Sequence, residues 1–224
     1  MIAPSAAARL LVGIVVSLWA HGGASAQAVF TPTQDPVAGA RLFQDKGCIQ
    51  CHAVNGVGGT SGPDLGRVQR PRSFYDSAAA MLNHVPEMAK RIWASGADRP
   101  RFTPAEMSDL MAFLYAPTTL GTSGRVEGGR PPIGEPGDPR RGRQLVTDKG
   151  CLTCHSVSGP GGKQAGNLKL LKGIDSPWTV LSVMWNHAFL MELESQSQKR
   201  AWPRLRSDEM ADLVAFLQAL MRAP

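Results

Sequence analysis

The chain has 224 residues, of which 43% are hydrophobic, and this composition excludes an intrinsically disordered protein. Its length suits one large domain or two domains of about a hundred residues each. The formal net charge of +6 is weak evidence for nucleic-acid binding.

The first 26 residues are predicted to be a secretory signal peptide. Arg9 precedes a short apolar run at residues 10–20, and an Ala-Ser-Ala sequence at residues 24–26 supplies a cleavage pattern. The run is too short to span a bilayer comfortably, which disfavours the alternative of an uncleaved membrane anchor. We therefore expect a mature chain that begins near Gln27, lies in the periplasm and has no transmembrane segment.

A short helix is predicted next. Asp35 fits the N-cap, and Pro36 fits the first helical position. The helix is expected to stop at Gly47, because glycine readily adopts the left-handed conformation that ends many helices. A motif of two cysteines and a histidine follows this glycine directly.

Cys48, Cys51 and His52 form a Cys-x-x-Cys-His motif, which is typical of c-type haem attachment. The two thiols would bond the haem vinyl groups, and the imidazole would bind the iron. The same motif returns 103 residues later as Cys151, Cys154 and His155. Two disulfides are an alternative, but each would close too small a loop to stabilise much. One shared zinc site is another, but it would leave both histidines unused. The sequence therefore predicts two covalently bound haem c groups.

The rest of the first half is predicted to contain one loop and further helices. The Gly-rich loop at residues 54–66 lacks the Gly-Lys-Ser/Thr sequence of a phosphate-binding loop. Residues 73–93 look helical, with an interruption near Pro86. Thr103 and Glu106 predict a capping box for the last helix. The expected apolar face of that helix is Met107, Leu110, Met111 and Leu114.

The same plan repeats at the 103-residue offset without a shift in register, so two tandem copies of one domain are expected. A segment rich in Gly, Pro, Thr and Arg separates the copies and reads as a linker. The predicted organisation is a signal peptide at 1–26, a first domain at 27–117, a linker at 118–137 and a second domain at 138–224.

Each half resembles a class I cytochrome c domain, and the whole chain resembles a periplasmic dihaem cytochrome c. The resemblance covers residues 35–116 and 138–220. It implies an all-α fold in which each domain is a small helical bundle around one covalently bound haem. It also implies that the first helix crosses the last at a glycine packed on an aromatic ring. The pairs in these roles are Gly39 with Phe113, and Gly142 with Phe216.

The resemblance also implies that a Gly-Pro-x-Leu element lies on the proximal side of each haem. Residues 62–65 fit this element, whereas residues 165–168 lack the proline. A carbonyl contact from this proline to the proximal histidine is therefore expected at the first haem and left unassigned at the second.

The distal iron ligand does not occupy the family's usual position. The methionine that usually precedes a proline before the last helix is replaced by Arg99 and Trp202. Both halves instead carry Met-x-Asn-His-x-x-x-Met, which on a helix places its methionines and histidine on one face. The resemblance to His/Met domains favours methionine, which raises the reduction potential. The predicted distal ligands are Met88 and Met191, and the alternatives are His84 and His187.

The other residues of this motif are expected to pack or to form hydrogen bonds. Met81 and Met184 are expected to pack against the haem ring. Asn83 and Asn186 are expected either to bond or orient the distal ligand, or to cap a helix end.

Electron transfer is the function that two such sites imply. A haem iron with two protein ligands has no open position for substrate and exchanges single electrons. The predicted role is a periplasmic electron carrier, not an enzyme, that meets its redox partners transiently. One alternative is a tightly bound cytochrome subunit of a periplasmic dehydrogenase or oxidase. The other is a dihaem peroxidase, in which one iron would lose its distal ligand.

Overall fold

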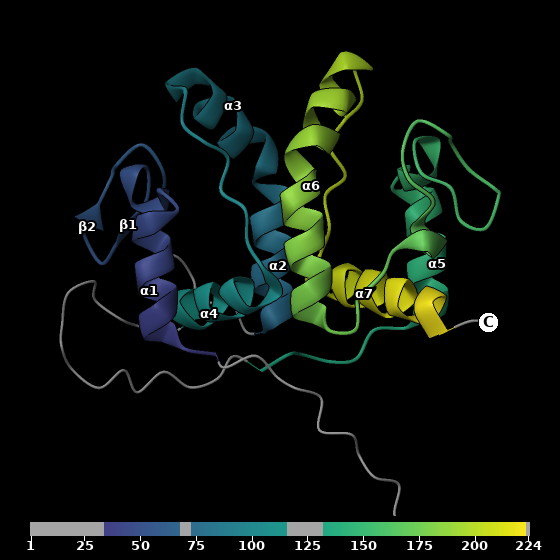
Figure 1. The fold of residues 1–224 in the computed structure, drawn as a ribbon, viewed down its shortest axis with the longest axis horizontal. Coiled ribbons are helices and arrows are strands. Elements are labelled where there is room, and N and C mark those ends of the chain that lie inside the picture. The colour runs from purple at the N-terminus through teal and green to yellow at the C-terminus, as the bar shows by residue number, and fades with distance from the viewer. Residues whose placement is uncertain (1–33, 68–72, 116–131, 223–224) are drawn as a thin grey trace, which may run out of the picture. The chain divides into compact units, whose positions relative to one another are not determined.

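The computed structural model describes residues 34–67, 73–115 and 132–222, which belong to one compact unit. These residues are mostly helical, so the predicted all-α class is confirmed (Figure 1). The first repeat contains α1 (Pro36–Asp45), a hairpin of β1 (Ala53–Val54) and β2 (Val57–Gly58), α2 (Phe74–Asn83), α3 (Val85–Ser95) and α4 (Pro104–Tyr115). The second repeat contains α5 (Pro139–Asp148), α6 (Pro177–Ser197) and α7 (Ser207–Arg222).

Two predicted segments lie wholly or partly outside the described residues. These are the signal peptide at 1–26 and residues 118–131 of the linker. The described end of the linker reaches α2, because the backbone N–H of Phe74 donates to the carbonyl of Pro132 at 2.8 Å. Among the described helices, none combines the length and the apolar character needed to cross a bilayer.

The predicted start and end of α1 are confirmed. The Asp35 side chain accepts hydrogen bonds from the backbone N–H groups of Val37 and Ala38. After the helix, Gly47 has a φ of 78°, a conformation that a residue with a Cβ rarely adopts. The second repeat uses the same devices, since Asp138 caps α5 and Gly150 has a φ of 73°.

The predicted interruption near Pro86 is also confirmed, and it distinguishes the two repeats. In the first repeat α2 ends at Asn83 and α3 begins at Val85, with Pro86 in its first turn. Phe189 stands at the equivalent position of the second repeat. It has the backbone N–H that proline lacks, and α6 continues unbroken for 21 residues.

Glycine allows the first helix of each repeat to cross the last helix closely. A Cβ at Gly39 would lie 2.7 Å from the Cβ of Phe113 and would overlap the backbone carbonyl of Asp109. A Cβ at Gly142 would likewise lie 2.6 Å from the Cβ of Phe216. Because no side chain fits there, the expected glycine–aromatic crossings of α1 with α4 and of α5 with α7 are confirmed.

The middle helices are exchanged between the repeats. Helix α2 of the first repeat packs on α7 of the second, while α6 of the second packs on α4 of the first. Helices α2 and α6 also contact each other, and Figure 1 shows them side by side. Between them, the rings of Phe74 and Trp178 meet edge-on at 4.3 Å, and both side chains are fully buried. Each repeat therefore completes its core with an element of the other.

Two asparagines hold this exchange in place. The Asn83 amide donates to the carbonyl of Leu205 at 2.8 Å, and its oxygen accepts from the Leu205 N–H at 2.9 Å. Asn186 makes the same pair of bonds with the backbone of Phe102, at 2.8 and 2.9 Å. The expected roles of these asparagines at a distal ligand or a helix end are wrong, since both amides bind the backbone of the other repeat.

Two tryptophans of the second repeat add bonds of the same kind. The Trp185 indole donates to the carbonyl of Pro100, and the Trp202 indole donates to the carbonyl of Leu82, both at 2.9 Å. Buried indole N–H groups need such partners. These bonds tie both long loops that precede the last helices to the middle helix of the opposite repeat.

Candidate functional site

The Cys-x-x-Cys-His motif folds into one tight turn in each repeat. In the first, the N–H groups of Cys51 and His52 both donate to the carbonyl of Cys48, at 3.2 and 2.9 Å. In the second, Cys154 and His155 donate to Cys151 at 3.3 and 3.0 Å. The turn brings the two thiols and the imidazole of each motif into one small region, as attachment to a single group requires.

The proximal imidazoles are held by a backbone carbonyl. His52 donates from Nδ1 to the carbonyl of Pro63 at 3.0 Å, and His155 donates from Nδ1 to that of Gly166 at 2.9 Å. A carbonyl can only accept, so Nδ1 carries the proton and Nε2 keeps the lone pair that binds a metal. The contact survives in the second repeat without the proline, because only its backbone oxygen is needed.

The Gly-rich loop lies directly against the motif. The N–H of Gly59 donates to the carbonyl of Ile49 at 2.8 Å, and that of Gly62 donates to the carbonyl of Cys51 at 2.7 Å. A Cβ at Gly62 would lie 2.6 Å from Cε1 of His52. Glycine is therefore used here for close approach to the turn and the imidazole, which agrees with the argument against a phosphate-binding loop.

A lysine before each motif was missed as a site residue. Lys46 Nζ donates to the carbonyl of Arg101 and pairs with Glu106, both at 2.9 Å. Lys149 makes equivalent contacts with Arg204 at 2.8 Å and Glu209 at 2.9 Å. These bonds fix each motif to the start of the last helix of its own repeat. The repetition of Asp-Lys-Gly before both motifs was the available signal.

The cysteines do not form a shared site. All four are free thiols in the structure. Within the described part of the chain, no three His, Cys, Asp or Glu side chains group as metal ligands, which counts against a zinc site common to both motifs. Burial raises the pKa of Cys48 to about 11 and also raises that of Cys151. These thiols are therefore protonated near neutral pH and do not resemble activated nucleophiles.

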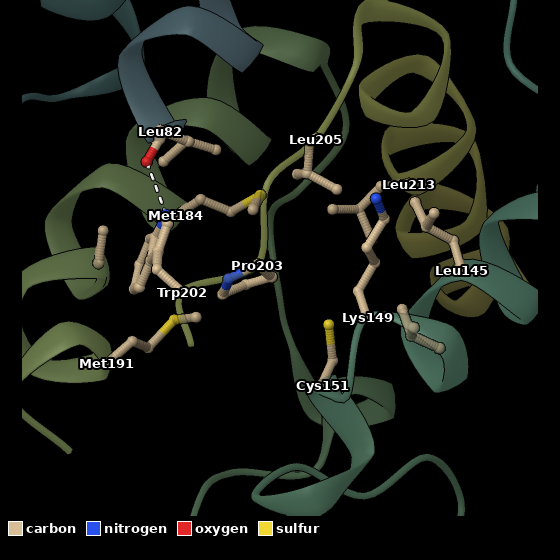
Figure 2. A pocket seen from close by; sticks show the side chains of 12 residues that line it. Leu82, Leu145, Lys149, Cys151, Met184, Met191, Trp202, Pro203, Leu205 and Leu213 are labelled. Atoms are coloured by element: carbon tan, nitrogen blue, oxygen red, sulfur yellow. Dashed lines mark hydrogen bonds between the residues drawn. The ribbon is translucent and has the colours of Figure 1, made fainter. Parts of the chain in front are cut away.

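An apolar pocket adjoins the motif of the second repeat. Its lining is almost entirely apolar, which is the character expected of a cofactor site. Figure 2 shows the sulfur atoms of Cys151 and Met191 directed into this space from opposite sides. Leu82 of α2 also lines the pocket, so the first repeat contributes to the wall. The other apolar lining residues are Leu145, Val146, Met184, Ala188, Trp202, Pro203, Leu205 and Leu213. The apolar character of these walls suits a haem attached at Cys151.

Helix α6 carries both candidate distal ligands of the second site, of which only Met191 lines the pocket. Met191 lines the pocket, and the ring of His187 lies 6.1 Å from that of His155, centroid to centroid. Partial burial lowers the pKa of His187, and the charge of Arg99 lowers it further. The neutral imidazole that can act as a ligand is therefore favoured. Met184 also lines the pocket, in line with a packing role.

The candidate distal ligands of the first repeat, His84 and Met88, lie in different surroundings from those of the second. His84 lies at the junction of α2 and α3, where its Nδ1 donates to the carbonyl of Ala80 at 2.7 Å. That bond leaves Nε2 with the free lone pair. Met81 and Met88 are half-buried against the hydrophobic core. Among the described ring contacts, none joins His84 to His52.

Comparison with known proteins gives one finding. A family model described as Cytochrome c matches the chain twice, at residues 36–116 and 139–221. No curated protein and no solved structure matches the chain. The two matched segments coincide with the two repeats, and each contains one Cys-x-x-Cys-His turn.

Proposed function

Since the chain belongs to the cytochrome c family, we propose that it is a periplasmic electron carrier with two covalently bound haem c groups. The family's domains serve haem-based electron transfer, which sets the class of function. The carrier role, the compartment and the transient nature of its partnerships are proposals. They rest on the predicted signal peptide and on the construction of the two sites.

The observation that carries the proposal is that one complete attachment site occurs in each repeat. Each turn holds two thiols beside an imidazole whose Nε2 is kept available by a carbonyl on Nδ1. A bound haem supplies one-electron chemistry. The residues that would hold the two haems are Cys48, Cys51, His52, Cys151, Cys154 and His155. The apolar side chains beside Cys151 would limit the access of water to a haem bound there, which is one of the factors that set its potential.

A second candidate function is that of a cytochrome subunit in a larger periplasmic redox complex. It is favoured by Val183, Leu190 and Leu193, which are exposed on α6 at helical spacing. An exposed apolar stripe of this kind suits a stable partner better than a brief encounter. Elution of the native protein in a complex with a catalytic subunit would favour this candidate over a free carrier.

The test is to produce the protein with a cytochrome c maturation system and recover it from the periplasmic fraction. We expect Gln27 as the first residue, two haems per chain that stay bound in acidified organic solvent, and reversible uptake of two electrons. Replacing Cys48 and Cys51 by serine should remove one covalent haem, and the matched change at Cys151 and Cys154 should remove the other. Haem released by acid solvent would refute covalent attachment, and sustained peroxide turnover would refute the simple carrier role.

A further inference from the structure

One side of α6 faces the pocket of the second repeat. Met184, Ala188 and Met191 line that pocket, and His187 lies at the edge of this side of the helix, where it is exposed and is not part of the lining. The sequence made Met191 and His187 rivals for the distal position. In the structure Met191 lines the pocket, whereas His187 lies outside the lining with its ring beside that of His155.

The distance between two imidazole rings distinguishes the two candidate ligands, His187 and Met191. A metal–imidazole bond of about 2 Å, added to a ring radius of about 1 Å, puts a ring centroid about 3 Å from its metal. Two imidazoles on opposite sides of one metal are then about 6 Å apart. The rings of His155 and His187 are 6.1 Å apart, with their planes inclined by 67°. His155 is already fixed as the proximal side chain by its bond to Gly166.

The absence of hydrogen bonds between the described residues and the His187 ring also favours His187 as the distal ligand. His187 is exposed, and among the hydrogen bonds of the described residues none involves either of its ring nitrogens, so neither nitrogen is committed to another protein group. Met191 by contrast lies in a wall of apolar side chains that includes Trp202 and Ala188, where a thioether packs well (Figure 2).

We propose that His187 is the distal iron ligand of the second haem and that Met191 is part of its apolar wall. This inference rests on the proposed function, because it needs a haem attached at Cys151 and Cys154. It reverses the preference for Met191 that the family resemblance gave. Two imidazoles hold the potential of a haem below that of an imidazole–thioether pair, so the second haem is the better reductant if the first has a methionine ligand.

The experiment uses the oxidised holoprotein and compares four variants by electron paramagnetic resonance and near-infrared absorption. The wild type should show a bis-imidazole signal. H187A should lose one haem equivalent of it, and added imidazole should restore that loss, which a merely structural role would not allow. M191L and M184L, matched changes on the same side of α6, should keep the signal unchanged. H187M should replace one equivalent by the sulfur-to-iron absorption band and should raise the potential of one haem.

Two results would overturn the assignment. One is a wild type without any bis-imidazole signal, and the other is H187A with the full signal while M191L abolishes a sulfur-to-iron band. Each result leaves two covalent, reducible haems in place, so the electron-carrier proposal would stand. Failure of covalent attachment would instead be seen as haem release in acid solvent, in the wild type and in every variant alike.

Discussion

The pKa values of two equivalent aspartates, Asp109 and Asp212, are shifted in opposite directions in the two repeats. Asp212 receives two bonds from the Arg141 guanidinium, at 2.8 and 2.9 Å, and this contact lowers its pKa. Asp109 occupies the same position in the first repeat, where Ala38 replaces the arginine. Burial, and then the charge of Asp35, raise the pKa of Asp109. Both aspartates still accept the backbone N–H that precedes the first helix of their repeat.

The substitution A38R should supply the missing partner and raise the midpoint of thermal unfolding at pH 7. The arginine should lower the pKa of Asp109 below its unfolded value, as Arg141 does for Asp212. A lowered carboxyl pKa stabilises the fold above the unfolded value of about 4, and the gain is lost as the pH falls through the folded value. The gain should therefore fade in unfolding measurements at pH 3. In a D109N background A38R should give no gain, and an equal gain there would refute the mechanism.

At the residue scale, the motif spacing alone predicts His52 and His155 as proximal ligands, and the structure holds each imidazole by a backbone carbonyl at Nδ1. The sequence could not rank His187 against Met191, since both fall on the same helical face and only the fold sets the distance of each from His155. The carbonyl partner of His155 could not be predicted from the Gly-Pro-x-Leu element, because residues 165–168 lack the proline, whereas the contact needs only a backbone oxygen.

At the scale of elements, each repeat depends on a close crossing of its first and last helices. Gly39 and Gly142 lie at these crossings with no room for a methyl group. The crossing positions the motif, because the turn follows the first helix directly and is bonded through Lys46 or Lys149 to the start of the last. The resemblance to class I cytochrome c domains implied these crossings, and both glycines and both phenylalanines recur at the fixed offset.

Replacing Gly142 by alanine should therefore destabilise the holoprotein by about 1–3 kcal/mol, the usual cost of overpacking a core. The added Cβ would lie 2.6 Å from that of Phe216, and α5 would have to move away from α7. Denaturant unfolding followed by circular dichroism measures the change. The control is G166A, because a Cβ at Gly166 meets no atom within 4 Å. Equal stability of both variants would show that the crossing is not tightly packed.

At the scale of the whole molecule, the exchange of middle helices joins the two repeats into one structure. The sequence showed that Asn83 and Asn186 recur, but not that each would bind the other repeat. Two copies of one unit carry the same residues whether the copies pack on themselves or on each other. Only the three-dimensional contacts distinguish these cases, which is why this part of the fold was not predicted.

The substitution N83A should destabilise the protein by about 1–3 kcal/mol, because it leaves the N–H and the carbonyl of Leu205 without their partner. N186A should cost a similar amount through Phe102. Q144A removes an exposed hydrogen bond to Asp148 and should change the stability by less than about 0.5 kcal/mol. Unfolding by denaturant, followed by tryptophan fluorescence, compares the three. An effect of N83A as small as that of Q144A would show that the two hydrogen bonds between Asn83 and Leu205 contribute little to the stability.

The exchange also has a consequence for the order in which the protein is made. A chain is synthesised from its N-terminus, and most domains fold as they emerge. Here α4 can pack on α1 within its own repeat, but α2 meets α7, and α4 meets α6, only when the second repeat has been produced. The first repeat therefore completes its core near the end of synthesis.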